Sequence, residues 1–305
     1  MRNIAVLIPC YNEAGTVGEV VASFRKHLPE ATVYVYDNCS EDETAEIARN
    51  AGAVVVPSKI RGKGNVVRKM FADIDADVYV MADGDSTYRA EDARKMINAL
   101  TEEKADMVVA VRKEKSEAAY RVGHKFGNRL FNFIMKMLFH STFRDIFSGY
   151  RVFSRRFVKT FPVTADGFDI EAELSIHALT LNIPFAEIES VYLERPACSY
   201  SKLSTFKDGF KILAKILKLL KETRPLFFFG AVSLLLFALS SATAYPIIVK
   251  FVETGLVPRL PTAILSTGIM IVSFLSLMCG IISDSVAKSR TEIKKLHYLL
   301  FNRAV

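Results

Sequence analysis

Two carboxylates, Asp83 and Asp85, follow directly after the apolar run Val78–Ala82 and are separated by a single glycine. Residues two apart in an extended segment point to the same side, so the two carboxylates can converge on one point. Oxygen ligands of this kind suit a hard divalent cation such as Mg²⁺ or Mn²⁺, which commonly neutralises a diphosphate. A solvated acidic turn after a strand is the alternative that the short motif leaves open.

Polar residues also follow other apolar runs that alternate with amphipathic ones. We expect strands at Ile4–Ile8, Val33–Tyr36, Val54–Val56, Val78–Ala82 and Met107–Ala110, and helices at Val17–Leu28, Thr44–Asn50, Asn65–Ala72 and Glu91–Glu103. Alternating strands and helices predict a mostly parallel α/β sheet covered on both faces. Ligands of such sheets bind beyond the carboxyl ends of the strands, where we expect Pro9–Glu13, Asp37–Ser40 and Asp83–Asp85 to meet. Ser40 and Glu43 predict a capping box for the second helix.

The last third of the chain has the composition of a membrane anchor. Half of the 305 residues are hydrophobic, and two uncharged runs, Leu226–Val249 and Ala263–Ile282, follow the charged first two-thirds. At about 1.5 Å per residue, each run is long enough to cross a hydrocarbon core of about 30 Å. A buried core helix is the alternative for one such run, but two in tandem, joined by Lys250–Pro261, predict a transmembrane hairpin.

Basic residues predict how this hairpin is oriented. The cations that flank it are Lys211, Lys215, Lys218, Lys221 and Arg224 before the first run and Lys288, Arg290, Lys294, Lys295 and Arg303 after the second, against Lys250 and Arg259 between them. By the positive-inside rule, both termini and the soluble domain are expected in the cytoplasm. We expect no signal peptide, because the first apolar run is too short. The net charge of +7 then suits an anionic membrane surface, and no nucleic-acid-binding signature accompanies it.

Two further stretches are amphipathic. Thr205–Glu222 sets apolar residues at spacings of three and four against a face of lysines, which predicts a helix in the membrane interface. Tyr120–Phe139 has a similar pattern, for which a surface helix of the soluble domain is the alternative. The sequence thus divides into a soluble domain at 1–203, a juxtamembrane amphipathic helix at 204–224, and two transmembrane helices with a cytoplasmic tail at 225–305.

Six short motifs carry a family resemblance. In chain order they are Ile8-Pro9-Cys10-Tyr11-Asn12-Glu13, Asp37-Asn38-Cys39-Ser40-Glu41-Asp42-Glu43-Thr44, Arg61-Gly62-Lys63-Gly64-Asn65, Asp83-Gly84-Asp85, Ser148-Gly149-Tyr150-Arg151 and Ser199-Tyr200-Ser201-Lys202-Leu203. With these motifs the chain resembles family 2 glycosyltransferases of the GT-A fold, over about two-thirds of its length. More narrowly, it is similar to the polyprenyl-phosphate glycosyltransferases, which include dolichyl-phosphate mannose synthase.

The resemblance implies a role for each motif. Asp85 would hold Mg²⁺ or Mn²⁺ directly, and Asp83 would reach the metal or the ribose. Lys202 would belong to a basic loop that closes over the donor phosphates, with membrane-surface charge as the alternative for its cations. The residues implied in binding the nucleotide sugar are Pro9, Tyr11, Asn12, Glu13, Asp37, Asn38, Lys63, Asp83, Arg195 and Ser201. Those implied in catalysis are Asp85, Asp145, Arg151 and Lys202.

The acceptor implied by the resemblance needs no general base. A lipid phosphate is already an anionic nucleophile, whereas a sugar hydroxyl has a pKa far above neutral and must lose its proton to a base. The obstacle for a lipid phosphate is repulsion from the donor diphosphate, which Arg112, Arg129 and Arg151 are expected to screen. Asp145 is then expected to position an arginine or the sugar. With a hydroxyl acceptor, the same Asp145 would be the base.

These expectations combine into one leading hypothesis. It is an inverting transfer of a hexose from a nucleotide sugar to polyprenyl phosphate at the cytoplasmic face of a membrane. Thr87 stands where dolichyl-phosphate mannose synthases tend to have Gln, and Cys198–Lys202 departs from their Gly-Ser-x-Ser-Lys loop, so UDP-glucose or UDP-GlcNAc is favoured as donor. The alternatives are a membrane glycosyltransferase with a hydroxyl acceptor, a GDP-mannose-dependent dolichyl-phosphate mannose synthase, and a non-catalytic nucleotide-sugar-binding protein. Membrane lipids are expected partners, and a homo-oligomer is left open.

Overall fold

The computed structural model describes residues 3–114, 143–162, 170–193, 217 and 220–301. It divides into two compact units, one of residues 1–203 and 294–305 and one of residues 204–293. The elements of the first unit are β1 (Ile4–Cys10), α1 (Val17–His27), β2 (Thr32–Asp37), α2 (Thr44–Asn50), β3 (Val54–Pro57), α3 (Lys63–Asp73), β4 (Val78–Met81), α4 (Asp92–Glu102), β5 (Met107–Glu114), β6 (Arg151–Ser154), α6 (Arg155–Thr160), α7 (Ile170–Leu181) and β7 (Phe185–Tyr192). Each strand and helix expected between residues 4 and 110 is present. Their ends lie within two residues of the expected ones, except that β5 continues to Glu114, four residues beyond the expected end.

The strands form one mixed sheet of seven, in the order β3-β2-β1-β4-β6-β5-β7. Strands β1 to β4 pair in parallel, as do β5 and β7, whereas β6 runs antiparallel to both of its neighbours. The mostly parallel sheet predicted from the alternating pattern is therefore confirmed. Because β1, β2 and β4 are parallel, their carboxyl ends lie at the same edge of the sheet.

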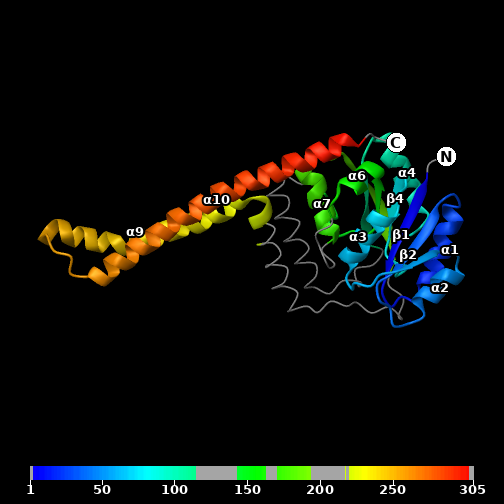
Figure 1. Ribbon diagram of the computed structural model, residues 1–305, viewed down its shortest axis with the longest axis horizontal. Helices are drawn as coiled ribbons and strands as arrows, with labels where there is room; N and C mark the ends of the chain where they lie inside the picture. Colours follow the sequence, from blue (N-terminus) through cyan, green and yellow to red (C-terminus); the bar gives the residue numbers. More distant parts are fainter. Residues whose placement is uncertain (1–2, 115–142, 163–169, 194–216, 218–219, 302–305) are drawn as a thin grey trace. The chain divides into compact units, whose positions relative to one another are not determined.

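Helices cover both faces of the sheet, which explains why its strands are apolar on both sides. Residues such as Val6, Val35 and Val80 share one core cluster with residues of α1 and α4. On the other face, Phe71 of α3 makes edge-to-face ring contacts with Tyr79 and Phe153. Figure 1 shows α1 and α2 beside β1 and β2, in the blue part of the chain.

The N-terminus of α2 differs from the predicted capping box. Glu43 is the N-cap residue, and no side-chain cap bond is made there. Asp42 takes that role, because its carboxylate accepts hydrogen bonds from the backbone N–H of Thr44, at 3.1 Å, and from the Thr44 hydroxyl. Ser40 instead accepts a hydrogen bond from the backbone N–H of Asn12, at 3.0 Å. The cap prediction was wrong because a residue distant in sequence uses the serine.

The second unit contains a helical hairpin of α9 (Pro225–Thr254) and most of α10 (Leu260–Leu300). Both are long and apolar enough to cross a membrane, and large apolar side chains cover their outer surface. Hydroxyls join them: Ser240 donates to the carbonyl of Ser266, at 2.7 Å, and Ser273 to that of Ser233, at 2.8 Å. These serines recur every seven residues on each helix, so small side chains form the contact, as in many membrane helix pairs.

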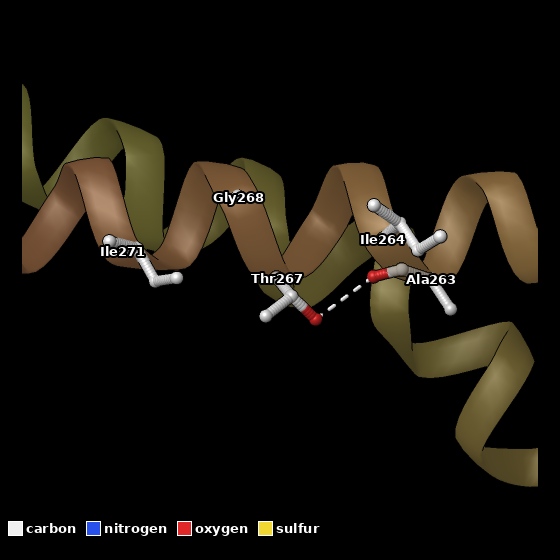
Figure 2. A pocket seen from close by; sticks show the side chains of 5 residues that line it. All are labelled: Ala263, Ile264, Thr267, Gly268 and Ile271. Atoms are coloured by element: carbon white, nitrogen blue, oxygen red, sulfur yellow. Dashed lines mark hydrogen bonds between the residues drawn. The ribbon is translucent and has the colours of Figure 1, made fainter.

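A groove on the outer surface of α10 is lined by small and apolar residues. It is lined by Ala263, Ile264, Thr267, Gly268 and Ile271, which Figure 2 shows along one stretch of the helix. The hydroxyl of Thr267 donates to the carbonyl of Ala263, at 2.9 Å, within the same helix. None of these residues is titratable. The polar segments predicted to meet at the sheet edge lie in the first unit.

The end of α10 belongs to the same compact unit as the sheet. Asp106, which precedes β5 and is fully buried, accepts hydrogen bonds from the hydroxyls of Ser154, at 2.7 Å, and Tyr298. Arg156 forms an ion pair with Asp106 and lies over the Tyr298 ring, with its Cζ atom 4.1 Å from the centroid. A buried carboxylate with several donors is well compensated, so this cluster ties the C-terminal turn to the start of β5 and the end of β6.

We predict that His177 makes the fold sensitive to acid. His177 is 5% exposed between the rings of Phe157 and Phe161, and its Nε2 has no hydrogen-bond partner among the described residues. Burial and, secondarily, the charge of Lys294 lower its pKa from 6.5 to about 3. Between these values the unfolded chain binds a proton that the folded chain excludes, so stability falls as pH falls below 6.5. At pH 5 the loss is about 2 kcal/mol.

Thermal unfolding of the full chain in detergent between pH 7 and pH 5 measures this loss. A His177→Leu variant, of similar volume, should lose much of the wild-type decrease in melting temperature over that interval. His27→Leu on α1 is the control and should follow the wild type. Equal pH dependence in wild type and His177→Leu would contradict the prediction.

Candidate active site

The carboxyl ends of β1, β2 and β4 bring the three predicted polar segments to one edge of the sheet. The loops after β1 and β2 are joined directly, because the Asn12 side chain accepts from the backbone N–H of Glu41, at 2.9 Å, and the Asn12 backbone N–H donates to Ser40, at 3.0 Å. Within the loop after β2, Asp37 accepts from the backbone N–H of Ser40, at 3.1 Å. Thr16 joins the loops after β1 and β4 by donating to the carbonyl of Gly84, at 2.7 Å. The structure thus brings together residues that are 28 to 68 positions apart in the sequence, as expected for a sheet of this topology.

Each of these three loops contains a non-glycine residue in the left-handed region of the backbone. Their φ angles are 51° at Asn12, 60° at Cys39 and 58° at Ser86. This conformation is uncommon for residues with a Cβ atom and costs about 1 kcal/mol or more, so the surrounding hydrogen bonds must hold it. Such strain is concentrated at binding and catalytic sites, and its position here agrees with a site at this edge.

Tyr11 and Asn38 connect the edge to the loop that precedes α3. The guanidinium of Arg61 lies over the Tyr11 ring, with its Cζ atom 4.3 Å from the centroid, and donates to the Tyr11 hydroxyl. Asn38 accepts a hydrogen bond from the backbone N–H of Gly62, at 3.0 Å. Gly62 has a φ angle of 127°, which residues with a Cβ atom rarely adopt, so the turn into α3 requires glycine.

Lys63 is the cation at the centre of the site. Its Nζ atom lies 2.6 Å from Asp83 Oδ1 and also contacts Glu171 Oε1, from the first turn of α7. The Lys63 side chain is 9% exposed, and its charge would be costly there without these partners. Burial by itself lowers the pKa of Lys63, but the charges of Asp83 and Glu171 outweigh it and raise the pKa above its ordinary value. Lys63 is therefore protonated at neutral pH.

Asp85, which is 3% exposed, is oriented by Thr87. One carboxylate oxygen accepts from the Thr87 hydroxyl, at 2.5 Å, and from its backbone N–H, at 3.2 Å. Thr87 thus positions Asp85, a role that the sequence comparison with Gln at this position did not suggest. The geometry suits a carboxylate whose orientation is set before a ligand arrives.

The loop that precedes β6 packs against the first carboxylate. A Cβ atom at Gly149 would lie 2.5 Å from Asp83 Oδ2, so only glycine leaves room for the carboxylate in its present position. The backbone N–H of Gly149 donates to the hydroxyl of Tyr88, at 3.0 Å, and burial raises the pKa of Tyr88 above its ordinary value. The Ser148–Arg151 motif therefore includes a residue whose small size matters to the site.

Arg151 is enclosed in the protein, where the charges of Glu171 and Asp145 act on its guanidinium. Its side chain is fully buried, and its guanidinium donates to the carbonyls of Ser148, at 2.8 Å, and Ile146, at 2.6 Å. Burial lowers the pKa of Arg151 to about 10, so the guanidinium remains charged at neutral pH. In this position Arg151 holds the loop that contains Gly149, which favours a structural role over the expected phosphate binding.

Asp145 and Arg112 form a two-point ion pair. Arg112 Nε lies 2.6 Å from Asp145 Oδ2, and Nη2 lies 2.9 Å from Oδ1. The Arg112 side chain is 16% exposed and the Asp145 side chain 9% exposed. The guanidinium of Arg112 also lies over the ring of Tyr192, with its Cζ atom 5.5 Å from the centroid. This is the arrangement of a carboxylate that positions an arginine, and it leaves Asp145 poorly placed to take a proton from a hydroxyl.

The remaining predicted residues divide into two groups. Pro9 lies within β1 in register with Tyr36, and Glu13 accepts from the backbone N–H groups of Thr16 and Val17 through its carbonyl. Arg129, Arg195, Ser201 and Lys202 lie outside the described residues, as do the stretch 120–139 and most of the helix predicted at 204–224. The site residues that sequence analysis missed are Glu171, Arg61 and Gly149, of which only the last two belong to recognised motifs.

The donor set suits a hard divalent cation shared with a substrate. Asp83 and Asp85 supply carboxylate oxygens, and no group of three or more His, Cys, Asp or Glu side chains that could hold a metal occurs within the described part of the chain. Mg²⁺ and Mn²⁺ in nucleotide-dependent enzymes are commonly bound by one or two carboxylates together with substrate phosphates. The residues present therefore fit a cation that arrives with a diphosphate.

Comparison with known proteins identifies the family. The sequence profile of Glycosyl transferase family 2 matches residues 5–161. Glycosyltransferase AglJ of Haloferax volcanii is 33% identical over 303 residues, which cover 97% of this chain and 98% of that protein. The dolichyl-phosphate hexose transferase of the same organism is 29% identical over 222 residues, or 73% of this chain and 96% of the relative.

A solved structure confirms the GT-A fold. Glucosyl-3-phosphoglycerate synthase from Mycobacterium tuberculosis, in complex with Mn²⁺, uridine diphosphate and phosphoglyceric acid, superposes with a TM-score of 0.60 at 21% identity. The superposition covers 72% of this chain and 78% of the synthase. From the family match, the full-length relative and the fold, the chain belongs to glycosyl transferase family 2 and is a glycosyltransferase that uses a nucleotide sugar as donor.

Proposed function

We propose that this glycosyltransferase moves a hexose from a UDP-sugar to a polyprenyl phosphate, with inversion at the anomeric carbon. The observation that carries the acceptor is the two-point ion pair between Asp145 and Arg112, because it engages the carboxylate expected to act as base for a hydroxyl acceptor. A lipid phosphate needs no such base. Two apolar helices and the likeness to a dolichyl-phosphate hexose transferase support the same acceptor.

The donor would bind across the edge formed by β1, β2 and β4. Tyr11, Asp37 and Asn38 would border the base and ribose, where Arg61 already contacts the Tyr11 ring. Asp85 and Asp83 would hold Mg²⁺ or Mn²⁺, which supplies positive charge to the diphosphate as the nucleoside diphosphate leaves. Lys63 would add a fixed positive charge beside the same carboxylates. UDP is favoured over GDP because the chain has Thr87 in place of the Gln of the mannose synthases and because Cys198–Lys202 departs from the family's Gly-Ser-x-Ser-Lys loop.

Charge explains what the protein must do for this reaction. The donor diphosphate and the acceptor phosphate repel each other, and the repulsion is strong at a site from which water is partly excluded. Arg112 and the predicted cations Arg129, Arg195 and Lys202 would offset it, whereas Asp145 would keep Arg112 in place. Transfer would occur by one in-line displacement, which inverts the anomeric configuration.

The membrane arrangement completes the proposal. With α9 and α10 spanning the bilayer, the excess of lysine and arginine on both sides of the hairpin would place both termini and the transferase domain in the cytoplasm. The domain bounds of 1–203, 204–224 and 225–305 belong to this proposal. The acceptor phosphate would then be presented at the cytoplasmic face of the membrane, where nucleotide sugars are available.

Product analysis with purified protein tests the proposed reaction. We expect a hexosyl lipid phosphate when the protein is incubated with UDP-glucose or UDP-GlcNAc, polyprenyl phosphate and Mn²⁺, and none with EDTA. Mass spectrometry of the extracted lipids, across UDP- and GDP-sugars and undecaprenyl and dolichyl phosphates, identifies donor and acceptor. Asp85→Asn should reduce product on the order of 100-fold, because it weakens the hold on the cation that would neutralise the diphosphate. Transfer of the hexose to hydroxyl acceptors alone, with none to polyprenyl phosphate, would overturn the proposal.

Asp145 separates the two acceptor classes. If Asp145 only positions Arg112, Asp145→Asn should lower turnover by about tenfold or less, whereas loss of a general base costs about 10²- to 10⁴-fold. Donor binding, measured by calorimetry with UDP, should survive in either case. Arg112→Gln is the matched partner variant, and the double variant should lose no more than the worse single variant because the two residues act as one unit. Additive losses would show that Asp145 has a separate role.

Gly149→Ala tests whether the position of Asp83 matters for donor binding. The added Cβ atom would force the Asp83 carboxylate to move, so Mn²⁺-dependent binding of UDP should weaken by about tenfold or more while the circular dichroism spectrum is retained. Gly230→Ala in α9 is the control, because its Cβ atom meets nothing within 4 Å. Unchanged Mn²⁺-dependent binding in Gly149→Ala would show that Asp83 is not needed in its present position.

A further inference from the structure

Glu171 is a buried carboxylate at the site that no recognised motif includes. Its side chain is 8% exposed, and one of its oxygens contacts the ammonium of Lys63. Asp83, the other partner of Lys63, is more accessible, at 27% exposure. Lys63 therefore joins one carboxylate that is sealed in the protein and one that is open to a ligand.

The tertiary structure holds Glu171 in this place through α7. The hydroxyl of Ser175, one turn later, donates to the carbonyl of Glu171, at 3.0 Å, and lies 3.3 Å from the carbonyl of Ile146. Ile146 in turn accepts from Arg151, in the loop that contains Gly149. The start of α7 and the loop against Asp83 are thus tied together, and Glu171 is fixed relative to both.

The two carboxylates compete for one positive charge. Asp83 can approach a divalent cation only if its pairing with Lys63 weakens, since an oxygen held by an ammonium is a poorer cation ligand. If Asp83 were the only carboxylate beside Lys63, the buried ammonium would lose its counter-charge when Asp83 moved, at a large cost in free energy. Glu171 removes this difficulty, because Lys63 remains paired with a buried carboxylate when Asp83 turns to the cation.

We propose that Glu171 is a positioning residue for donor binding, which keeps Lys63 paired and so allows Asp83 to exchange the lysine for the divalent cation of the nucleotide complex. This inference rests on the proposed function, in which the donor is bound together with Mg²⁺ or Mn²⁺. Its effect is on cation affinity. Without Glu171, Lys63 would hold Asp83 as its sole carboxylate partner, and the cation would have to displace it.

The experiment measures Mn²⁺ binding to the purified full chain in detergent, in the presence of saturating UDP, by electron paramagnetic resonance of free Mn²⁺. Glu171→Gln should raise the apparent dissociation constant for Mn²⁺ about tenfold, and Glu171→Asp should restore part of the loss. Glu173→Gln, two residues further along α7, removes the same charge and should leave Mn²⁺ affinity close to that of wild type. Thermal unfolding of each variant shows whether the fold is retained.

A second variant separates competition for Asp83 from a general loss of negative charge. In a Lys63→Gln background Asp83 has no lysine to leave, so adding Glu171→Gln should change the dissociation constant for Mn²⁺ by less than about twofold. A full tenfold effect in that background would overturn the inference, because it would show that Glu171 acts through charge alone. The same conclusion follows if Glu171→Gln lowers thermal stability but leaves Mn²⁺ affinity unchanged.

Measurements on the wild type distinguish a failure of the proposed function from a failure of the role proposed for Glu171. Mn²⁺ binding that depends on UDP supports the proposed function whatever the variants do, so a normal Glu171→Gln variant would then overturn the role of Glu171 alone. A wild-type protein that binds no Mn²⁺ with UDP, UDP-glucose or UDP-GlcNAc would overturn both the metal-dependent donor site and the inference that rests on it.

Discussion

The buried ion pair between Lys63 and Asp83 is the interaction on which the arrangement of the site depends. It joins the start of α3 to the end of β4, and Glu171 extends it to α7, so three elements far apart in the sequence meet at one ammonium group. A charge with 9% exposure is tolerated only with partners in good geometry. Because Lys63 must stay paired, the start of α3, the end of β4 and the start of α7 must lie close together.

Pairing is also how the remaining charges of the site are organised. Arg112 is held by Asp145, and Arg151 by carbonyl groups of the loop before β6, so neither guanidinium depends on a ligand for compensation. Both cations are therefore held in place by groups of the protein itself. Pairing also explains why a carboxylate near a sugar-transfer site need not be a base: Asp145 has both oxygens engaged by one arginine, which suits an acceptor that is already an anion.

The interactions that join the two helices of the hairpin differ from those that stabilise the sheet. In the membrane proposed for the hairpin, apolar side chains would gain little by packing against one another, so close approach of the backbones and hydroxyl bonds between the helices would hold the pair together. Ser233, Ser240, Ser266 and Ser273 supply both, at a spacing of seven residues on each helix. The sheet and the hairpin are thus stabilised by different means, which is why their sequences differ so clearly in composition.

The sequence alone was enough for the fold class, the order of the first nine elements, the carboxylate pair Asp83 and Asp85, and the two apolar helices. All of these depend on local periodicity or on short motifs, which involve residues that are close together in the sequence. Tertiary structure decided the rest: that Arg151 is buried, that Asp145 pairs with Arg112, that Asp42 takes the place of Ser40 at a helix cap, and that Glu171 meets Lys63 from 108 residues away. Burial and long-range pairing depend on how elements pack, and an isolated stretch of sequence contains no record of which distant side chain will be its neighbour.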